Sequence, residues 1–172
     1  MNSSTGPNER GAFGKCGFND NICILRSIPH FSRMSLEALK VMAFLAKRVN
    51  YRGGEELFTQ GDVGRFACHI LEGRAELVRN GRVLDEFGPG VFVGGLHILS
   101  ATTLLFSLRA ANDLTALVFE RELIKPRLDR DCESARIYME GVVKAVVQWE
   151  ERLLKKLQGR DIPPGMVGVS LA

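Results

Sequence analysis

The sequence is short of the residues that metal centres, disulfide frameworks and membrane spans require. Its four cysteines, Cys16, Cys23, Cys68 and Cys132, form no CxxC pair and have no histidine at metal-ligand spacing. No window holds the roughly 18 apolar residues that span a bilayer, and the polar N-terminus lacks the apolar stretch of a signal peptide. These absences predict a protein without a metal, a cofactor or a membrane partner, and they place it in the cytoplasm.

Concentrated charge and catalytic constellations are also missing. The 23 Lys and Arg against 20 Asp and Glu leave a net charge of +3 that is spread along the chain, whereas nucleic-acid binding needs positive charge on one face. His30, His69 and His97 stand in no catalytic or metal arrangement. Cys16 and Cys23 are too few for an iron–sulfur cluster, which takes about four thiolates. We therefore expect a non-enzymatic protein.

Composition and periodicity divide the chain into four parts. Residues 1–21, rich in Ser, Asn and Gly, are expected to be a flexible arm, and residues 22–125 a folded domain. Residues 126–158 have the apolar period of a long helix, and residues 159–172, with Pro163-Pro164, are expected to be a flexible tail. Inside the domain, Ser35 is a suitable N-cap for a helix over about 35–47.

Short strands separated by glycine turns occupy the middle of the sequence. The runs with strand character are 56–59, 67–71, 75–78, 82–84, 105–110 and 116–119. Asn80-Gly81 predicts a type I′ hairpin turn, because both residues tolerate a positive φ. Regular spacing of this kind indicates an antiparallel barrel or sandwich. The predicted fold class is α+β, an antiparallel β-barrel of the jelly-roll or double-stranded β-helix type with N-terminal helices and a long C-terminal dimerisation helix.

The apolar residues of the long helix recur every 3.5 residues on average. This spacing is typical of a coiled-coil seam, and it predicts a homodimer; the alternative is a helix that folds back on its own domain. Gly141 within the helix costs about 1 kcal/mol relative to Ala, and it indicates a bend or a close approach. The predicted seam consists of Leu128, Cys132, Ala135, Met139, Val142, Val146, Trp149 and Leu153.

Several local phrases, in order, resemble one known family. They are Ile28-Pro29-His30-Phe31-Ser32, Tyr51-Arg52-Gly53-Gly54-Glu55, Gln60-Gly61-Asp62, Ile70-Leu71-Glu72-Gly73-Arg74-Ala75 and Phe87-Gly88-Pro89-Gly90-Val91-Phe92. The stretch from Leu25 to Leu128 is similar to the cyclic-nucleotide-binding domain of the catabolite activator protein, protein kinase A regulatory subunits and gated channels. The resemblance implies the same fold.

The resemblance also implies a phosphate-binding cassette, in which a short helix, a Glu and an Arg hold the sugar and the cyclic phosphate. In this sequence the Glu position falls on Gly95 and the Arg position on Leu104. Two lost charge-assisted hydrogen bonds of about 1.5–3 kcal/mol each weaken binding roughly 100-fold or more. We therefore expect a degenerate pocket that does not bind cyclic AMP or cyclic GMP usefully. The cassette positions are Phe92, Val93, Gly94, Gly95, Leu96, His97, Leu104, Leu105 and Phe106.

Two further features bear on the pocket. In the family the long helix covers the ligand, and its base-contacting positions would fall near Gln148 and Trp149; Trp149 could fill the space of the base. Arg109 could supply a positive charge if it points inward, or it could lie on the surface.

Three functional hypotheses remain. The first is a dimeric regulatory module, an interaction or pseudo-sensor domain with a protein partner. The second is a sensor for a cyclic nucleotide, a cyclic dinucleotide or another small molecule that binds through the modified cassette. An enzyme is the third and has no motif in its favour. Only residues 159–172 follow the long helix, too few for a helix-turn-helix, so we expect no direct DNA binding.

Overall fold

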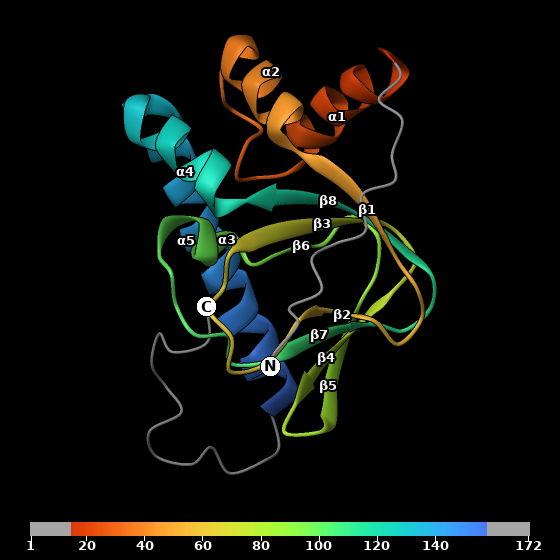
Figure 1. Ribbon diagram of the computed structural model, residues 1–172. Coiled ribbons are helices and arrows are strands. Elements are labelled where there is room, and N and C mark those ends of the chain that lie inside the picture. Colours follow the sequence, from red (N-terminus) through yellow and green to blue (C-terminus); the bar gives the residue numbers. More distant parts are fainter. Residues whose placement is uncertain (1–14, 158–172) are drawn as a thin grey trace, which may run out of the picture.

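The computed structural model describes residues 15–157, in which helices pack on one side of a pair of β-sheets (Figure 1). The predicted tail, and residues 1–14 of the predicted arm, lie outside the described residues. The helices are α1 (Lys15–Ser27), α2 (Leu36–Leu45), α3 (Gly95–Leu99), α4 (Arg121–Arg130) and α5 (Cys132–Leu157). The strands are β1 (Lys47–Tyr51), β2 (Glu56–Phe58), β3 (Phe66–Glu72), β4 (Ala75–Arg79), β5 (Arg82–Phe87), β6 (Phe92–Val93), β7 (Ser107–Ala110) and β8 (Leu114–Glu120).

The eight strands form two antiparallel sheets, and these sheets do not close into a barrel. The strand order is β1-β8-β3-β6 in one sheet and β2-β7-β4-β5 in the other. The prediction of an α+β fold with antiparallel sheets is confirmed, but that of a closed barrel is wrong. In the described part of the chain β1 and β6 remain edges of one sheet, and β2 and β5 remain edges of the other. Alternating apolar residues and glycine turns look alike in both architectures, so the sequence did not distinguish them.

The hairpin between β4 and β5 forms as its sequence predicts. Asn80 has φ of 51° and Gly81 has φ of 74°, the positive values that a type I′ turn needs. Arg79 faces Arg82 across the turn, and Ala75 faces Phe87 at the far end. The turn therefore fixes the register of a hairpin that carries Leu77 and Phe87 to the candidate site described below.

The first two helices pack together on the outer face of the β1-β8-β3-β6 sheet. Helix α2 begins after Ser35, whose Oγ accepts a hydrogen bond from the N–H of Ala38 at 3.2 Å, which confirms Ser35 as the N-cap. Helix α1 begins at Lys15, inside the range expected to be a flexible arm. Phe18 and Ile22 give it an apolar side that packs on the core, and this short run escaped the search for a repeating period.

The predicted continuous helix over 126–158 is two helices, and this prediction is corrected. Asp131 has extended backbone angles between α4 and α5, and its Oδ1 accepts hydrogen bonds from the N–H groups of Glu133 and Ser134 at 3.2 and 3.3 Å. Asp131 therefore caps α5 and ends α4. Pro126 lies within α4 instead of starting the long helix.

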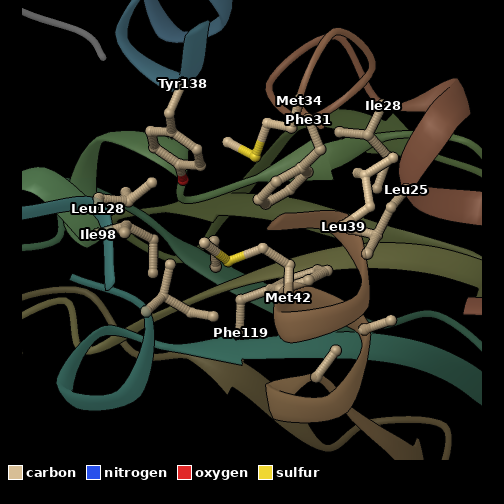
Figure 2. Packing of buried hydrophobic residues seen from close by; sticks show 14 of the residues in the cluster. Leu25, Ile28, Phe31, Met34, Leu39, Met42, Ile98, Phe119, Leu128 and Tyr138 are labelled. Atoms are coloured by element: carbon tan, nitrogen blue, oxygen red, sulfur yellow. The ribbon is translucent and has the colours of Figure 1, made fainter. Parts of the chain in front are cut away.

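Two apolar clusters hold the molecule together. The first lies between the helices and the outer face of the β1-β8-β3-β6 sheet, where Phe31, Met42, Phe119 and Tyr138 meet (Figure 2). The second fills the space between the sheets, with Phe58, Ile70 and Leu108 among its members. Together they make α5, α3 and the turn after α1 parts of one packed structure, which is the setting of the candidate site.

Within residues 15–157 no helix is long and apolar enough to cross a membrane. The same residues contain no group of three His, Cys, Asp or Glu side chains that could hold a metal ion.

Candidate ligand pocket

The candidate site is built around the short helix α3 and the glycine that precedes it. Strand β6 ends at Val93, and Gly94 turns the chain into α3 with a φ of 84°. A Cβ on Gly94 would lie 2.9 Å from the carbonyl oxygen of Phe66 and 3.0 Å from the ring of Phe58. Both the angle and the space therefore require glycine here.

His30 occupies the space beside Gly95. A Cβ on Gly95 would lie 2.9 Å from Nε2 of His30, and the imidazole packs on the ring of Phe92 with centroids 4.5 Å apart. His30 is only 3% exposed, and its Nδ1 has no hydrogen-bond partner among the described residues. Burial lowers the pKa of His30 to about 4, so the imidazole is neutral at pH 7. Any larger side chain at position 95 would have to displace it.

Helix α5 crosses this region in direct contact with both His30 and Gly95. Tyr138 Oη donates a hydrogen bond of 3.0 Å to the carbonyl oxygen of Gly95. A Cβ on Gly141 would lie 2.5 Å from Cα of His30, so Gly141 marks a close approach of α5 to the turn after α1. The sequence had left a bend and a close approach open, and the structure shows the second.

A pocket of about 300 Å³ opens between α5, α3 and the two sheets. Most of its wall is apolar, and four of its side chains are aromatic rings from Phe87, Phe92, Phe106 and Trp149. The lining residues are Ile28, Pro29, His30, Leu77, Phe87, Gly90, Val91, Phe92, Val93, Gly94, Gly95, Leu96, His97, Phe106, Val142, Ala145, Val146, Gln148, Trp149 and Arg152.

Comparison with known proteins identifies the domain that forms the sheet side of this pocket. Residues 48–131 match the family model described as the cyclic nucleotide-binding domain. Those residues belong to the cyclic nucleotide-binding domain family. No curated protein matches the chain.

Solved structures agree with this assignment. The chain is 28% identical to a cyclic nucleotide-binding-like protein from Brucella abortus, with a TM-score of 0.58 and coverage of 64% of this chain and 98% of that one. A putative cyclic nucleotide-binding protein from Geobacter metallireducens is 19% identical, with a TM-score of 0.65 and coverage of 72% and 93%. The N-terminal domain of a transcriptional regulator from Streptomyces coelicolor is 22% identical, with a TM-score of 0.63 and coverage of 76% and 94%. The last two likenesses concern the fold.

The structure brings together most of the cassette positions named from the sequence, but two of them lie elsewhere. Leu104 is buried among the residues between the sheets, while its backbone N–H and C=O pair with the loop at Gly61 and Asp62. Leu105 is 39% exposed and does not line the pocket. The positions that line it are Phe92, Val93, Gly94, Gly95, Leu96, His97 and Phe106, together with the two residues named on the long helix, Gln148 and Trp149.

Sequence reasoning missed two residues of this pocket, His30 and Arg152. The phrase around His30 served only to indicate the fold, although a histidine in an otherwise apolar turn was a signal that it packs at a special position. The family resemblance had selected Gln148, and Arg152 lies one helical turn after it on α5, so the i, i+4 spacing from Gln148 could have found it.

Charges in and near the pocket are few. Arg152 is the one charged side chain among the described residues that line it, and its Nε makes only a 3.4 Å hydrogen bond to the backbone of Gln148. Arg109 lies on the surface, where its guanidinium pairs with Glu76 at 2.7 Å, so it does not supply charge to the pocket. His97 Nδ1 lies 2.9 Å from Thr102 Oγ1, and burial lowers the pKa of His97.

The predicted dimer seam does not form one face of a helix. Leu128, in α4, and Val142 are buried in the core of the chain, Val146 and Ala135 pack against that core, and Trp149 lines the pocket. Cys132 and Met139 are exposed, and the side chain of Leu153 lies outside the described residues. Two features explain the difference. The break at Asp131 separates α4 from α5, and α5 itself contacts the core and the pocket on different sides. A repeat of 3.5 residues that is followed across such a break combines residues from different helix faces.

Proposed function

We propose that this chain is a non-enzymatic regulatory module that does not bind cyclic AMP or cyclic GMP in the usual way. The observation that carries the proposal is the wall beside α3. Gly95 stands where the sequence resemblance expects a Glu, and His30 fills the space such a side chain would need. Leu104 stands where it expects an Arg, and it is buried between the sheets.

The missing groups are sufficient to abolish useful affinity. A hydrogen bond to a charged group contributes about 1.5–3 kcal/mol, so the absence of two raises the dissociation constant roughly 100-fold or more. At the position of the missing Arg, burial of a phosphate against the apolar side chain of Leu104 would add a desolvation cost. The described lining residues include no carboxylate to accept a ribose hydroxyl.

Calorimetric titration with cyclic AMP, cyclic GMP and a cyclic dinucleotide tests this proposal. We expect no saturable heat at ligand concentrations up to about 100 µM, a range in which a Kd of 10 µM gives a complete curve. Binding of cyclic AMP or cyclic GMP with a Kd below about 10 µM would overturn it.

We propose further that two copies pair through α5. Met139, Val143, Val147 and Leu154 are exposed to between 47% and 61% and follow one another in steps of four, four and seven residues, so they form one apolar stripe. Charged residues Arg136 and Lys144 flank the groove around Met139 and Val143. A two-fold axis brings the same stripe of both copies together, which is the arrangement that a self-complementary helix face favours.

Light scattering at several concentrations tests the pairing. We expect a dimer for the natural chain and a monomer for Val143→Glu, because the carboxylate would be buried in the stripe. Val83→Glu is the matched control, since Val83 is equally apolar and 52% exposed but lies on β5. A natural chain that remains monomeric at all concentrations, or a Val143→Glu variant that dimerises like Val83→Glu, would contradict the pairing.

A second candidate function is a sensor for a small molecule other than a cyclic mononucleotide. The observation in its favour is the pocket itself, because Trp149 lies on its wall and leaves a volume of about 300 Å³. Contacts of α5 with His30 and Gly95 would let an occupant influence the helix that carries the apolar stripe.

A further inference from the structure

We propose that the pocket binds a small, mainly apolar, aromatic molecule that carries a single negative charge, with Arg152 as its counter-ion. The inference rests on the second candidate function, that of a small-molecule sensor. It adds the chemical class of the ligand and the residue that selects for its charge.

The wall of the pocket favours a planar, apolar body. Phe87 and Phe92 come from β5 and β6, Phe106 from the segment before β7, and Trp149 from α5, so aromatic rings border the pocket from separate elements. Aliphatic side chains such as Leu77, from β4, line the space between them. Aromatic faces and edges pack well against another ring, and such contacts add to the gain from burying apolar area.

The charge distribution favours an anion over a neutral molecule or a cation. None of the described lining residues is acidic, and Arg152 makes no ion pair with a described residue. Arg152 is solvent-exposed at the pocket, and an arginine that is free to form a bidentate pair recognises a carboxylate specifically.

His30 adds a neutral ring to this wall, where its imidazole packs on Phe92. Burial lowers the pKa of His30 to about 4, so the ring carries no charge at pH 7. Arg152 is therefore the charged group among the described lining residues.

The size of the pocket limits the part of a ligand that it can bury. At the packing density of a protein interior, 300 Å³ holds about a dozen non-hydrogen atoms. A bicyclic aromatic carboxylate has this size, whereas a cyclic mononucleotide is larger and carries a polar ribose. Size and charge therefore point to the same class.

A pair of probes of equal shape tests the inference. 1-Naphthoate and 1-naphthamide differ only in that the first is charged, and calorimetry on the full chain measures the affinity of each. The indole Nε1–H signal of Trp149, the single tryptophan, reports by NMR whether either probe enters the pocket. We expect 1-naphthoate to bind with a Kd below about 100 µM and at least tenfold more tightly than 1-naphthamide, with a shift of the Trp149 signal.

Substitution of the arginine separates its role from general binding. Arg152→Gln should weaken 1-naphthoate at least tenfold and leave 1-naphthamide unchanged. Arg79→Gln is the matched control, because Arg79 is an exposed arginine on the β4–β5 hairpin, and it should change neither affinity.

Three results would overturn the inference. The first is that the two probes bind with equal affinity or that neither binds. The second is that Arg152→Gln and Arg79→Gln have the same effect. The third is that 1-naphthoate binds without a change in the signal of Trp149. None of these would restore cyclic nucleotide binding, which is tested separately by the titration with cyclic AMP and cyclic GMP.

Discussion

Replacement of Gly141 by alanine tests the close approach of α5 to His30. In a free helix, Gly→Ala stabilises by about 1 kcal/mol. Here the new Cβ would lie 2.5 Å from Cα and 2.9 Å from N of His30, which are backbone atoms that cannot rotate away. Overpacking of this kind costs about 1–3 kcal/mol and brings further loss when backbone must shift. We therefore expect Gly141→Ala to lower the free energy of unfolding by about 1–2 kcal/mol, the reverse of the usual sign.

The measurement is urea unfolding followed by circular dichroism, supported by the melting temperature, which should fall by about 2–4 °C per kcal/mol for a chain of this size. Gly17→Ala in α1 is the matched control. Nothing lies within 4 Å of a Cβ at Gly17, so this change should leave stability unchanged or raise it by up to about 1 kcal/mol. If Gly141→Ala is as stable as Gly17→Ala, the packing of α5 on His30 described above is wrong.

Two further predictions concern the same region. The pKa of His30 is 6.5 in the unfolded chain and about 4 in the folded protein. As the pH drops below 6.5, the unfolded chain takes up the proton first and is stabilised. The free energy of unfolding is therefore highest above pH 6.5 and falls by about 3 kcal/mol as the pH drops to 4. Urea unfolding between pH 7.5 and 4.5 should show this loss, and His30→Gln should flatten the profile; an unchanged slope would contradict it. Tyr138→Phe removes the hydrogen bond to the carbonyl of Gly95 and should cost about 1–2 kcal/mol, whereas Tyr51→Phe removes a hydroxyl that forms no such bond with a described residue and should cost less. Equal melting temperatures for the two variants would show that the bond to Gly95 adds nothing.

Local sequence signals predicted those parts of the fold that local interactions decide. Asn80-Gly81 and Ser35 specify a turn and a cap through their own backbone and side-chain geometry, and both appear where predicted. The short strand β1 and the two-residue strand β6 were not predicted, because their residues pair with β8 and β3, which lie far away in the sequence. Strand pairing at long range overrides weak local preference.

The candidate site was predictable in its backbone and less so in its side chains. Gly94 and Gly95 marked the turn into α3 in the sequence. Glycine patterns of this kind are readable because the backbone geometry of the turn itself requires glycine. That Leu104 turns inward between the sheets, and that His30 fills the space beside Gly95, depend on contacts between segments more than forty residues apart. A periodic pattern in one segment carries no information on such contacts.

Asp131, the single extended residue between α4 and α5, interrupts the helical hydrogen bonds, so α4 does not fix the direction of α5. A continuous helix would fix the direction of its second half by the stiffness of its backbone, but here contacts along α5 hold it in place. They are the burial of Ile137, Tyr138 and Val142 in the core, the hydrogen bond of Tyr138 to Gly95, the close approach of Gly141 to His30, and the surface ion pair between Arg33 and Glu140. The ion pair is exposed and contributes at most about 1 kcal/mol. The direction of α5 therefore depends on how the helix packs on the core and on the pocket wall, and a change in the position of His30 would change that direction.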